Sequence, residues 1–174
     1  MLNGIPVELP AMLAAREERA SRQAAWLKEY AHPLLSFTLN IPGPIKTSAE
    51  LQRAFEEGRV ALERRLRAAQ LPCIAQMEVH NVTGDESLLA IDGDAAEIKR
   101  ICTEIEEHHP LGRLFDLDVL AADGTKLSRP LPRRCLLCTE QAQVCARSRR
   151  HSVAQLQEVV ERLLRTDYEM PPPA

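Results

Sequence analysis

The chain contains few aromatic residues, and this scarcity limits both its core and its partners. Phe, Trp and Tyr make up 3% of the 174 residues. The core therefore has to be built mainly from Leu, Ile, Val and Ala. Proteins that bind single-stranded nucleic acid commonly stack bases on aromatic side chains. We therefore expect no nucleic-acid partner.

Long apolar runs are also missing. No segment approaches the roughly 18 consecutive apolar residues of a membrane-spanning helix, and the first residues show no basic region followed by an apolar stretch. We expect no membrane partner and a cytoplasmic location. A length of 174 residues with a formal net charge of −3 predicts one domain over residues 1–174 and excludes a large multidomain enzyme.

The spacing of apolar residues predicts an α+β fold. Residues 33–121 read as strand, helix, strand, strand, helix, strand, which is the split βαβ (βαββαβ) arrangement. Two helices should cover one face of an antiparallel sheet, and we expect the second face and the strand ends to be open to a ligand. An extra helix is expected before this core, at residues 8–30, and a Cys- and Arg-rich segment with a final helix after it, at residues 133–166.

Local signals predict where the helices begin and which sides they bury. Thr47 with Glu50 and Asp94 with Glu97 have capping-box spacing, so the two core helices should start there. In the first helix, Arg16, Arg19 and Arg22 recur at helical spacing and are expected on the solvent side. In the last helix, the apolar stripe is expected to be Val153, Leu156, Val160 and Leu163.

Two carboxylates in an apolar strand are the leading candidate for a catalytic site. In a strand, Phe115, Leu117 and Val119 point to one face while Asp116 and Asp118 share the other. Two neighbouring anions favour a cation between them, and Mg²⁺ is the usual one in phosphoryl and nucleotidyl transfer. The alternative is a surface strand whose polar face happens to be acidic.

Four possible metal ligands follow within 17 residues. Cys135 and Cys138 have the two-residue gap that lets two thiolates bind one ion, and Cys145 and His151 complete a soft set that suits zinc. Five cysteines are an odd number, and a reducing compartment disfavours disulfides. The alternative is that these cysteines are core residues of a small helical segment.

Arginines are interleaved with these cysteines. They are Arg133, Arg134, Arg147, Arg149 and Arg150. Guanidinium groups match phosphate oxygens two at a time, so the cluster is suited to a polyphosphate ligand or an acidic protein partner. A solvated basic face is the alternative interpretation.

Three of these segments together resemble one family. They are PLLSFTLNIPGPIK at residues 33–46, HPLGRLFDLDV at 109–119 and RRCLLCTEQAQVCARSRRH at 133–151. In their order and spacing they are similar to citrate lyase holo-acyl-carrier-protein synthase, also called apo-citrate lyase phosphoribosyl-dephospho-CoA transferase. The resemblance implies a nucleotidyltransferase that joins 2'-(5''-triphosphoribosyl)-3'-dephospho-CoA to a serine of the citrate lyase acyl carrier (gamma) subunit and releases diphosphate.

The reaction implied by the resemblance assigns roles to the candidate residues. Asp116 and Asp118 would hold Mg²⁺, and one of them would orient or deprotonate the serine. Arg113 lies three residues before Asp116 and would contact the triphosphate. The other expected substrate contacts are Lys46, Gly43, Arg134 and Arg147, and His109 is a further candidate acid or base.

Two alternatives stay open at this point. The first is the equivalent transferase for the carrier subunit of malonate decarboxylase, which uses the same donor. The second is a non-enzymatic, zinc-stabilised module that binds an acidic protein or nucleic acid through its arginines. The arginines of residues 8–30 and those of the cysteine-rich segment are both candidates for steering an acidic carrier protein.

Overall fold

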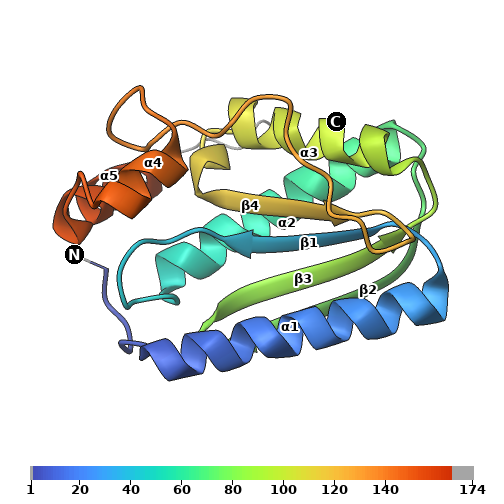
Figure 1. Ribbon diagram of the computed structural model, residues 1–174, viewed down its shortest axis with the longest axis horizontal. Coiled ribbons are helices and arrows are strands. Elements are labelled where there is room, and N and C mark those ends of the chain that lie inside the picture. Colours follow the sequence, from blue (N-terminus) through green and yellow to red (C-terminus); the bar gives the residue numbers. More distant parts are fainter. Residues whose placement is uncertain (1, 166–174) are drawn as a thin grey trace.

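The computed structural model describes residues 2–165, which form an antiparallel sheet with helices on both sides (Figure 1). The helices are α1 (Leu9–Tyr30), α2 (Ala49–Ala68), α3 (Ala95–His108), α4 (Ala142–Ser148) and α5 (Val153–Arg165), and the strands are β1 (Leu34–Leu39), β2 (Cys73–Asn81), β3 (Gly84–Ile91) and β4 (Phe115–Leu120). The strand order is β2-β3-β1-β4, and every neighbouring pair is antiparallel. The predicted α+β fold with βαββαβ order is confirmed. Residue 166, the expected end of the last segment, lies outside the described residues.

Side-chain caps set the starts of the two core helices. At α2 the cap is Ser48, whose Oγ accepts a hydrogen bond from the backbone N–H of Leu51 at 3.2 Å. The prediction of Thr47 was wrong by one residue, because the hydroxyl that reaches the third helical N–H is that of Ser48. At α3, Oδ1 of Asp94 accepts from the N–H of Glu97 at 2.9 Å, as predicted.

The main core lies between the sheet and the helices α2 and α3, and it gathers all three Phe residues of the chain. The rings of Phe37 and Phe55 stack with centroids 4.8 Å apart, and Phe115 meets Phe37 edge to face at 5.3 Å. Gly58 of α2 lies directly over them, since a Cβ there would come within 2.5 Å of the Phe37 ring. A glycine therefore lets α2 approach the sheet closely.

Helix α1 packs against the opposite face of the sheet, in front of β3 and β2 in Figure 1. Trp26, Leu27 and Tyr30 cover Leu34 on β1 together with Leu88 and Ala90 on β3. The expectation that the second face is open was wrong over this area. The apolar side chains of β1 and β3 on that face need a cover, and the C-terminal half of α1 supplies it.

Two of the three arginines of α1 also point to the sheet. Nη2 of Arg19 lies 2.6 Å from Oε1 of Glu86, and Nη2 of Arg22 lies 2.5 Å from Oε2 of the same carboxylate. Glu86 belongs to β3 and is buried. The prediction that these arginines face solvent was wrong, because a buried carboxylate needs hydrogen-bonded cations.

Helices α4 and α5 lie together at one end of the sheet (Figure 1). Val160 and Leu164 of α5 are buried in the main core, and the carbonyl of Leu164 accepts from Nη2 of Arg53 on α2 at 3.0 Å. Val153, expected in the apolar stripe, is half exposed because it stands in the first turn of α5. Within residues 2–165, no helix has the length and apolar character needed to cross a membrane.

Candidate active site and cysteine cluster

The paired carboxylates lie on β4 as the alternation predicted. Phe115, Leu117 and Val119 are buried in the core, while Asp116 and Asp118 point to the other face and are partly exposed. On the neighbouring strand β1, Thr38 is paired with Asp116 and Ser36 with Asp118. The acid pair therefore shares its sheet face with small polar side chains.

The electrostatics of this pair are asymmetric. Oδ2 of Asp118 lies 2.6 Å from Nζ of Lys126, in the loop after β4. Burial, and next the charge of Asp118, raise the pKa of Asp116, although Arg133 and Lys126 oppose this. The positive charges around Asp116 therefore do not fully balance the negative charge of its ionised carboxylate. An oxygen pair with excess negative charge fits a divalent cation such as Mg²⁺.

Buried charged side chains hold the outer edge of β4. Nζ of Lys99 donates to the carbonyl of Leu117 at 2.8 Å, and Oε1 of Glu106 accepts from the N–H of the same residue at 2.9 Å. Arg133 donates through Nη2 to the carbonyl of Phe115 at 2.6 Å and lies 2.8 Å from Oε1 of Glu106. These contacts fix the backbone on both sides of Asp116.

A pocket of about 480 Å³ lies beside the beginning of β4. Arg133, Arg134 and Arg149 contribute to its wall, together with Asn40 at the end of β1 and Leu156 of α5. Nη1 of Arg133 is buried and has no hydrogen-bond partner within residues 2–165. The pocket is therefore basic, which suits an anionic ligand.

Arg113 also lines this pocket, but its guanidinium is already engaged. Nη2 donates to the carbonyls of Arg134 and Cys135 at 2.7 and 3.0 Å. Burial, followed by the nearby charges of Arg133 and Arg129, lowers the pKa of Arg113. The structure therefore gives Arg113 a role in anchoring the cysteine-rich segment to the start of β4.

Three other candidate substrate contacts are not among the residues that line this pocket. Nζ of Lys46 donates to the carbonyl of Ile41 at 2.5 Å, and burial lowers the pKa of Lys46. Gly43 has φ of 87°, and a Cβ there would overlap the amide of Gln157 on α5, so the close approach is to α5. Arg147 is exposed on α4 and does not belong to the pocket wall. Their substrate contacts remain predictions.

His109 stabilises the turn before β4. Its Nδ1 accepts a hydrogen bond from the N–H of Leu111 at 3.1 Å, and its ring packs on Phe115 with centroids 4.9 Å apart. Burial lowers the pKa of His109, so the neutral ring is favoured. These contacts give His109 a structural role in the turn. A role for His109 as acid or base remains a prediction.

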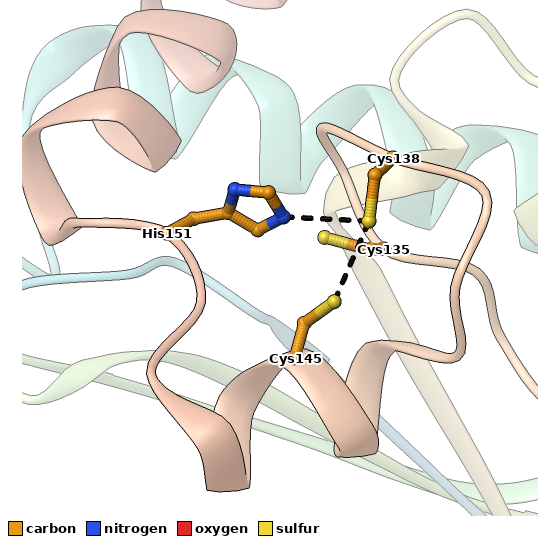
Figure 2. Close-up of side chains that lie close together, drawn as sticks. All are labelled: Cys135, Cys138, Cys145 and His151. Carbon is orange, nitrogen blue, oxygen red and sulfur yellow. Dashed lines mark hydrogen bonds between the residues drawn. The ribbon is translucent and has the colours of Figure 1, made fainter.

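The four predicted soft ligands come together, and Figure 2 shows their side chains pointing toward one another. Their ligand atoms all lie within 4.8 Å of one another. Sγ of Cys138 is 3.5 Å from Sγ of Cys145 and 3.3 Å from Nε2 of His151. Cys135 and Cys138 lie in the loop before α4, Cys145 lies within α4, and His151 follows that helix. The cluster could hold a metal ion.

Backbone donors support the first thiol of this cluster. Burial alone would raise the pKa of Cys135, but N–H groups of Leu137 and Cys138 and the neighbouring thiols together bring that pKa below its ordinary value. The N–H of Leu137 lies 3.5 Å from Sγ of Cys135. A sulfur that accepts backbone N–H groups is a better thiolate ligand.

Sequence reasoning missed two residues of this region. Lys126 pairs with Asp118 across a loop, and no local motif marks it. Asn40 belongs to the pocket wall, and its only signal was its position at the end of the strand that neighbours the acid pair.

Comparison with known proteins agrees with the resemblance. A family model described as apo-citrate lyase phosphoribosyl-dephospho-CoA transferase matches residues 7–167. A protein of that name from Escherichia coli O7:K1 is 45% identical over 163 residues, which cover 91% of this chain and 88% of that protein. A protein with the same name from Shigella boydii serotype 18 is 44% identical with the same coverage. The chain therefore belongs to the apo-citrate lyase phosphoribosyl-dephospho-CoA transferase family.

Proposed function

We propose that this protein transfers 2'-(5''-triphosphoribosyl)-3'-dephospho-CoA to a serine of the apo-citrate lyase acyl carrier subunit and releases diphosphate. Its family supports this reaction. The structural observation that carries the proposal is the position of Arg133. This residue lines the basic pocket and donates to the carbonyl of Phe115, the residue directly before Asp116. The proposed phosphate site would thus lie beside the start of the strand that carries the acid pair.

The arginine-lined pocket is the proposed site of the triphosphate. Arg134 and Arg149 are exposed in its wall, and the half-buried Arg133 lines it as well. Guanidinium groups bind phosphate oxygens through paired N–H groups, and they neutralise the charge that develops on a departing diphosphate. The basic wall therefore serves both ground-state binding and departure of the leaving group.

Asp116 and Asp118 are the proposed Mg²⁺ ligands. The fit rests on their chemistry, because two carboxylates on one sheet face provide hard oxygen donors and Asp116 lacks a full counter-charge. When bound, Mg²⁺ would neutralise phosphate charge during transfer. Nζ of Lys126 lies 2.6 Å from Asp118 and compensates its charge.

The proton of the acceptor serine needs a destination. The serine oxygen forms a bond to the innermost phosphorus, the bond from that phosphorus to the diphosphate breaks, and the hydroxyl proton passes to a carboxylate of the acid pair. Asp116 is the proposed base, because burial and the charge of Asp118 raise its pKa. The buried bonds of Lys99 and Glu106 hold the strand that positions it.

The carrier protein is proposed to approach the exposed arginines of the cysteine-rich segment. Acyl carrier proteins are typically acidic, and Arg147 and Arg150 are exposed outside the pocket wall. Of the other candidates, Arg19 and Arg22 are engaged with Glu86, and Arg16 is exposed on α1. Charge complementarity would steer the carrier to the same end of the molecule as the donor.

The decisive experiment is the intact mass of the apo-carrier after incubation with this protein, Mg²⁺ and the donor. We expect a mass gain equal to the donor minus diphosphate. Asp118→Asn should reduce the rate about 100-fold or more, the scale of losing a charge-stabilising group at a reaction centre. Glu17→Gln, an exposed change on α1, is the matched control and should retain full activity.

Two results would argue against this proposal. No mass gain with folded enzyme and competent carrier would reject transfer to the citrate lyase subunit, and a gain only on the malonate decarboxylase carrier would reassign the acceptor. Full activity in Asp118→Asn would reject the role of the acid pair while leaving the transfer reaction in place.

A further inference from the structure

The cysteine cluster has the geometry of a closed tetrahedral metal site. With zinc–sulfur bonds of about 2.3 Å, two thiolates on one zinc ion lie about 3.8 Å apart. The Cys138 and Cys145 sulfurs are 3.5 Å apart, and Nε2 of His151 is 3.3 Å from the Cys138 sulfur. All four ligand atoms lie within 4.8 Å of one another. A small inward or outward adjustment would thus place one ion between them.

The segment that carries these ligands has almost no apolar core of its own. Between residues 133 and 152, the buried residues are Cys135 and Cys145. Of its larger apolar side chains, Leu136 is half-buried and packs against the main core, whereas Leu137 and Val144 are 39% and 49% exposed. A short segment without a core needs a metal or covalent link to hold one structure. The candidate metal ligands Cys135 and Cys145 therefore also form the interior of this segment.

Backbone contacts preorganise the ligand loop. The N–H of Cys135 donates to the carbonyl of Glu140 at 2.7 Å, and the N–H of Ala142 donates to the carbonyl of Arg133 at 2.8 Å. These bonds close the chain from Arg133 to Ala142 into a tight loop that carries Cys135 and Cys138. The N–H of Arg150 then donates to the carbonyl of Cys145 at 3.2 Å, which turns the chain back toward His151.

We propose that Cys135, Cys138, Cys145 and His151 bind one structural Zn²⁺ ion that holds the wall of the arginine-lined pocket. Three thiolates and one imidazole fill a tetrahedral site and suit zinc in preference to hard cations. Arg133 and Arg134 directly precede Cys135, and Arg149 lies two residues before His151, so fixing the ligands also fixes these guanidinium groups. The link between the zinc site and the pocket wall rests on the proposed function of the pocket.

The zinc site is tested by metal analysis of the whole protein purified under reducing conditions. We expect one zinc per chain, and less than about one tenth of that in Cys138→Ser, because a closed site tolerates no missing ligand. Cys73→Ser is the matched control, since Cys73 is an exposed cysteine on β2 away from the cluster. If Cys138→Ser does not fold, removal of metal from the unmodified protein by a chelator and titration with Co²⁺ gives the same information from the tetrahedral thiolate absorption bands.

Three other outcomes of the metal analysis would contradict the proposed zinc site. Metal-free protein with titratable thiols would show that the cysteines are ordinary core residues. A disulfide between Cys138 and Cys145, found by mass spectrometry under non-reducing conditions, would replace the metal by a covalent link. Iron in place of zinc would overturn the identity of the ion.

The effect on the pocket has its own readout, the binding of inorganic triphosphate measured by calorimetry. Zinc removal should weaken this binding at least about 10-fold, and zinc re-addition should restore it. Unchanged triphosphate binding in zinc-free protein would overturn the link to the pocket and leave the zinc site standing. Because metal content and triphosphate binding need neither carrier nor turnover, failure of the transferase reaction would not be confused with failure of the zinc site.

Discussion

Nζ of Lys126 lies 2.6 Å from Oδ2 of Asp118, so a loop lysine neutralises one of the two carboxylates on β4. Both side chains are accessible, with 62% and 33% of their surfaces exposed. An ion pair of this kind is weak, typically about 0.2–1 kcal/mol. A divalent cation can therefore displace the ammonium at small cost.

Lys126→Gln should make Mg²⁺ binding tighter. Without the competing ammonium, the Mg²⁺ concentration for half-maximal activity should fall about two- to five-fold, which corresponds to the energy of an exposed ion pair. The measurement is a Mg²⁺ titration of the transfer rate, with the exposed Lys28→Gln on α1 as control. A higher Mg²⁺ requirement in Lys126→Gln would contradict competition and would indicate that Lys126 contacts the phosphates.

Asp116→Asn should raise stability at neutral pH. Burial, and next the charge of Asp118, raise the pKa of Asp116, so the folded state keeps this proton to higher pH than the unfolded state. The stabilisation of the folded state by protonated Asp116 is complete below the unfolded-state pKa of about 3.9. It is lost as the pH rises through the pKa of Asp116 in the folded state. Asparagine does not ionise and avoids this loss. In metal-free buffer, Tm of Asp116→Asn should exceed that of the unmodified protein at about pH 7 and match it at about pH 3.5.

Asp123→Asn provides a control of opposite sign for this pH effect. The backbone N–H of Thr125, with its side chain next, lowers the pKa of Asp123, so the stabilising contribution of Asp123 is present above the unfolded pKa and is lost as pH falls. Tm of Asp123→Asn should be unchanged or lower near neutral pH. A gain in Tm for Asp116→Asn that is equal at both pH values would show that it does not arise from ionisation.

Arg134→Ala and Arg147→Ala should separate the two substrates. Arg134 is exposed in the pocket wall, so its loss should raise KM for the donor about 10-fold, the scale of a charge-assisted hydrogen bond. Arg147 lies outside that wall, so its loss should raise KM for the carrier and reduce the salt dependence of transfer. Steady-state kinetics with each substrate varied in turn measures both. Equal effects of both variants on donor KM would contradict this division.

Gly58→Ala should destabilise the protein by about 1–3 kcal/mol, because the added methyl group meets the Phe37 and Phe115 rings. The gain in helix propensity, about 1 kcal/mol, offsets only part of the cost of this clash. Chemical unfolding measures the difference. Gln52→Ala on the exposed side of α2 is the matched control and should change the free energy of unfolding by less than about 0.5 kcal/mol. A Gly58→Ala protein as stable as the original would show that the helix and sheet move apart without penalty.

Features set by local periodicity were predictable from the sequence. The alternation on β4 placed Asp116 and Asp118 on one face, and the short spacing of Cys135, Cys138, Cys145 and His151 anticipated their convergence. Both depend on residues close in the chain, where strand or loop geometry limits the possible arrangements.

Features set by tertiary partners were not predictable. Helix α1 contains no fully buried residue, so its sequence gives little indication of which side meets the sheet. Arg19 and Arg22 turn inward because of Glu86, more than 60 residues later in the chain. Lys126 likewise reaches Asp118 only once the loop after β4 has folded back. Such pairings depend on topology and leave no periodic signal.

The side-chain bonds along the outer edge of β4 also restrict how a partner can dock. Edge strands commonly recruit an extended peptide by pairing backbone with backbone, and in some proteins this leads to aggregation. At Leu117 both backbone groups are occupied, by Lys99 and Glu106, and the carbonyl of Phe115 is occupied by Arg133. Strand addition at this edge would require breaking buried charged contacts. A carrier protein is therefore not expected to reach the acid pair by adding a strand at this edge.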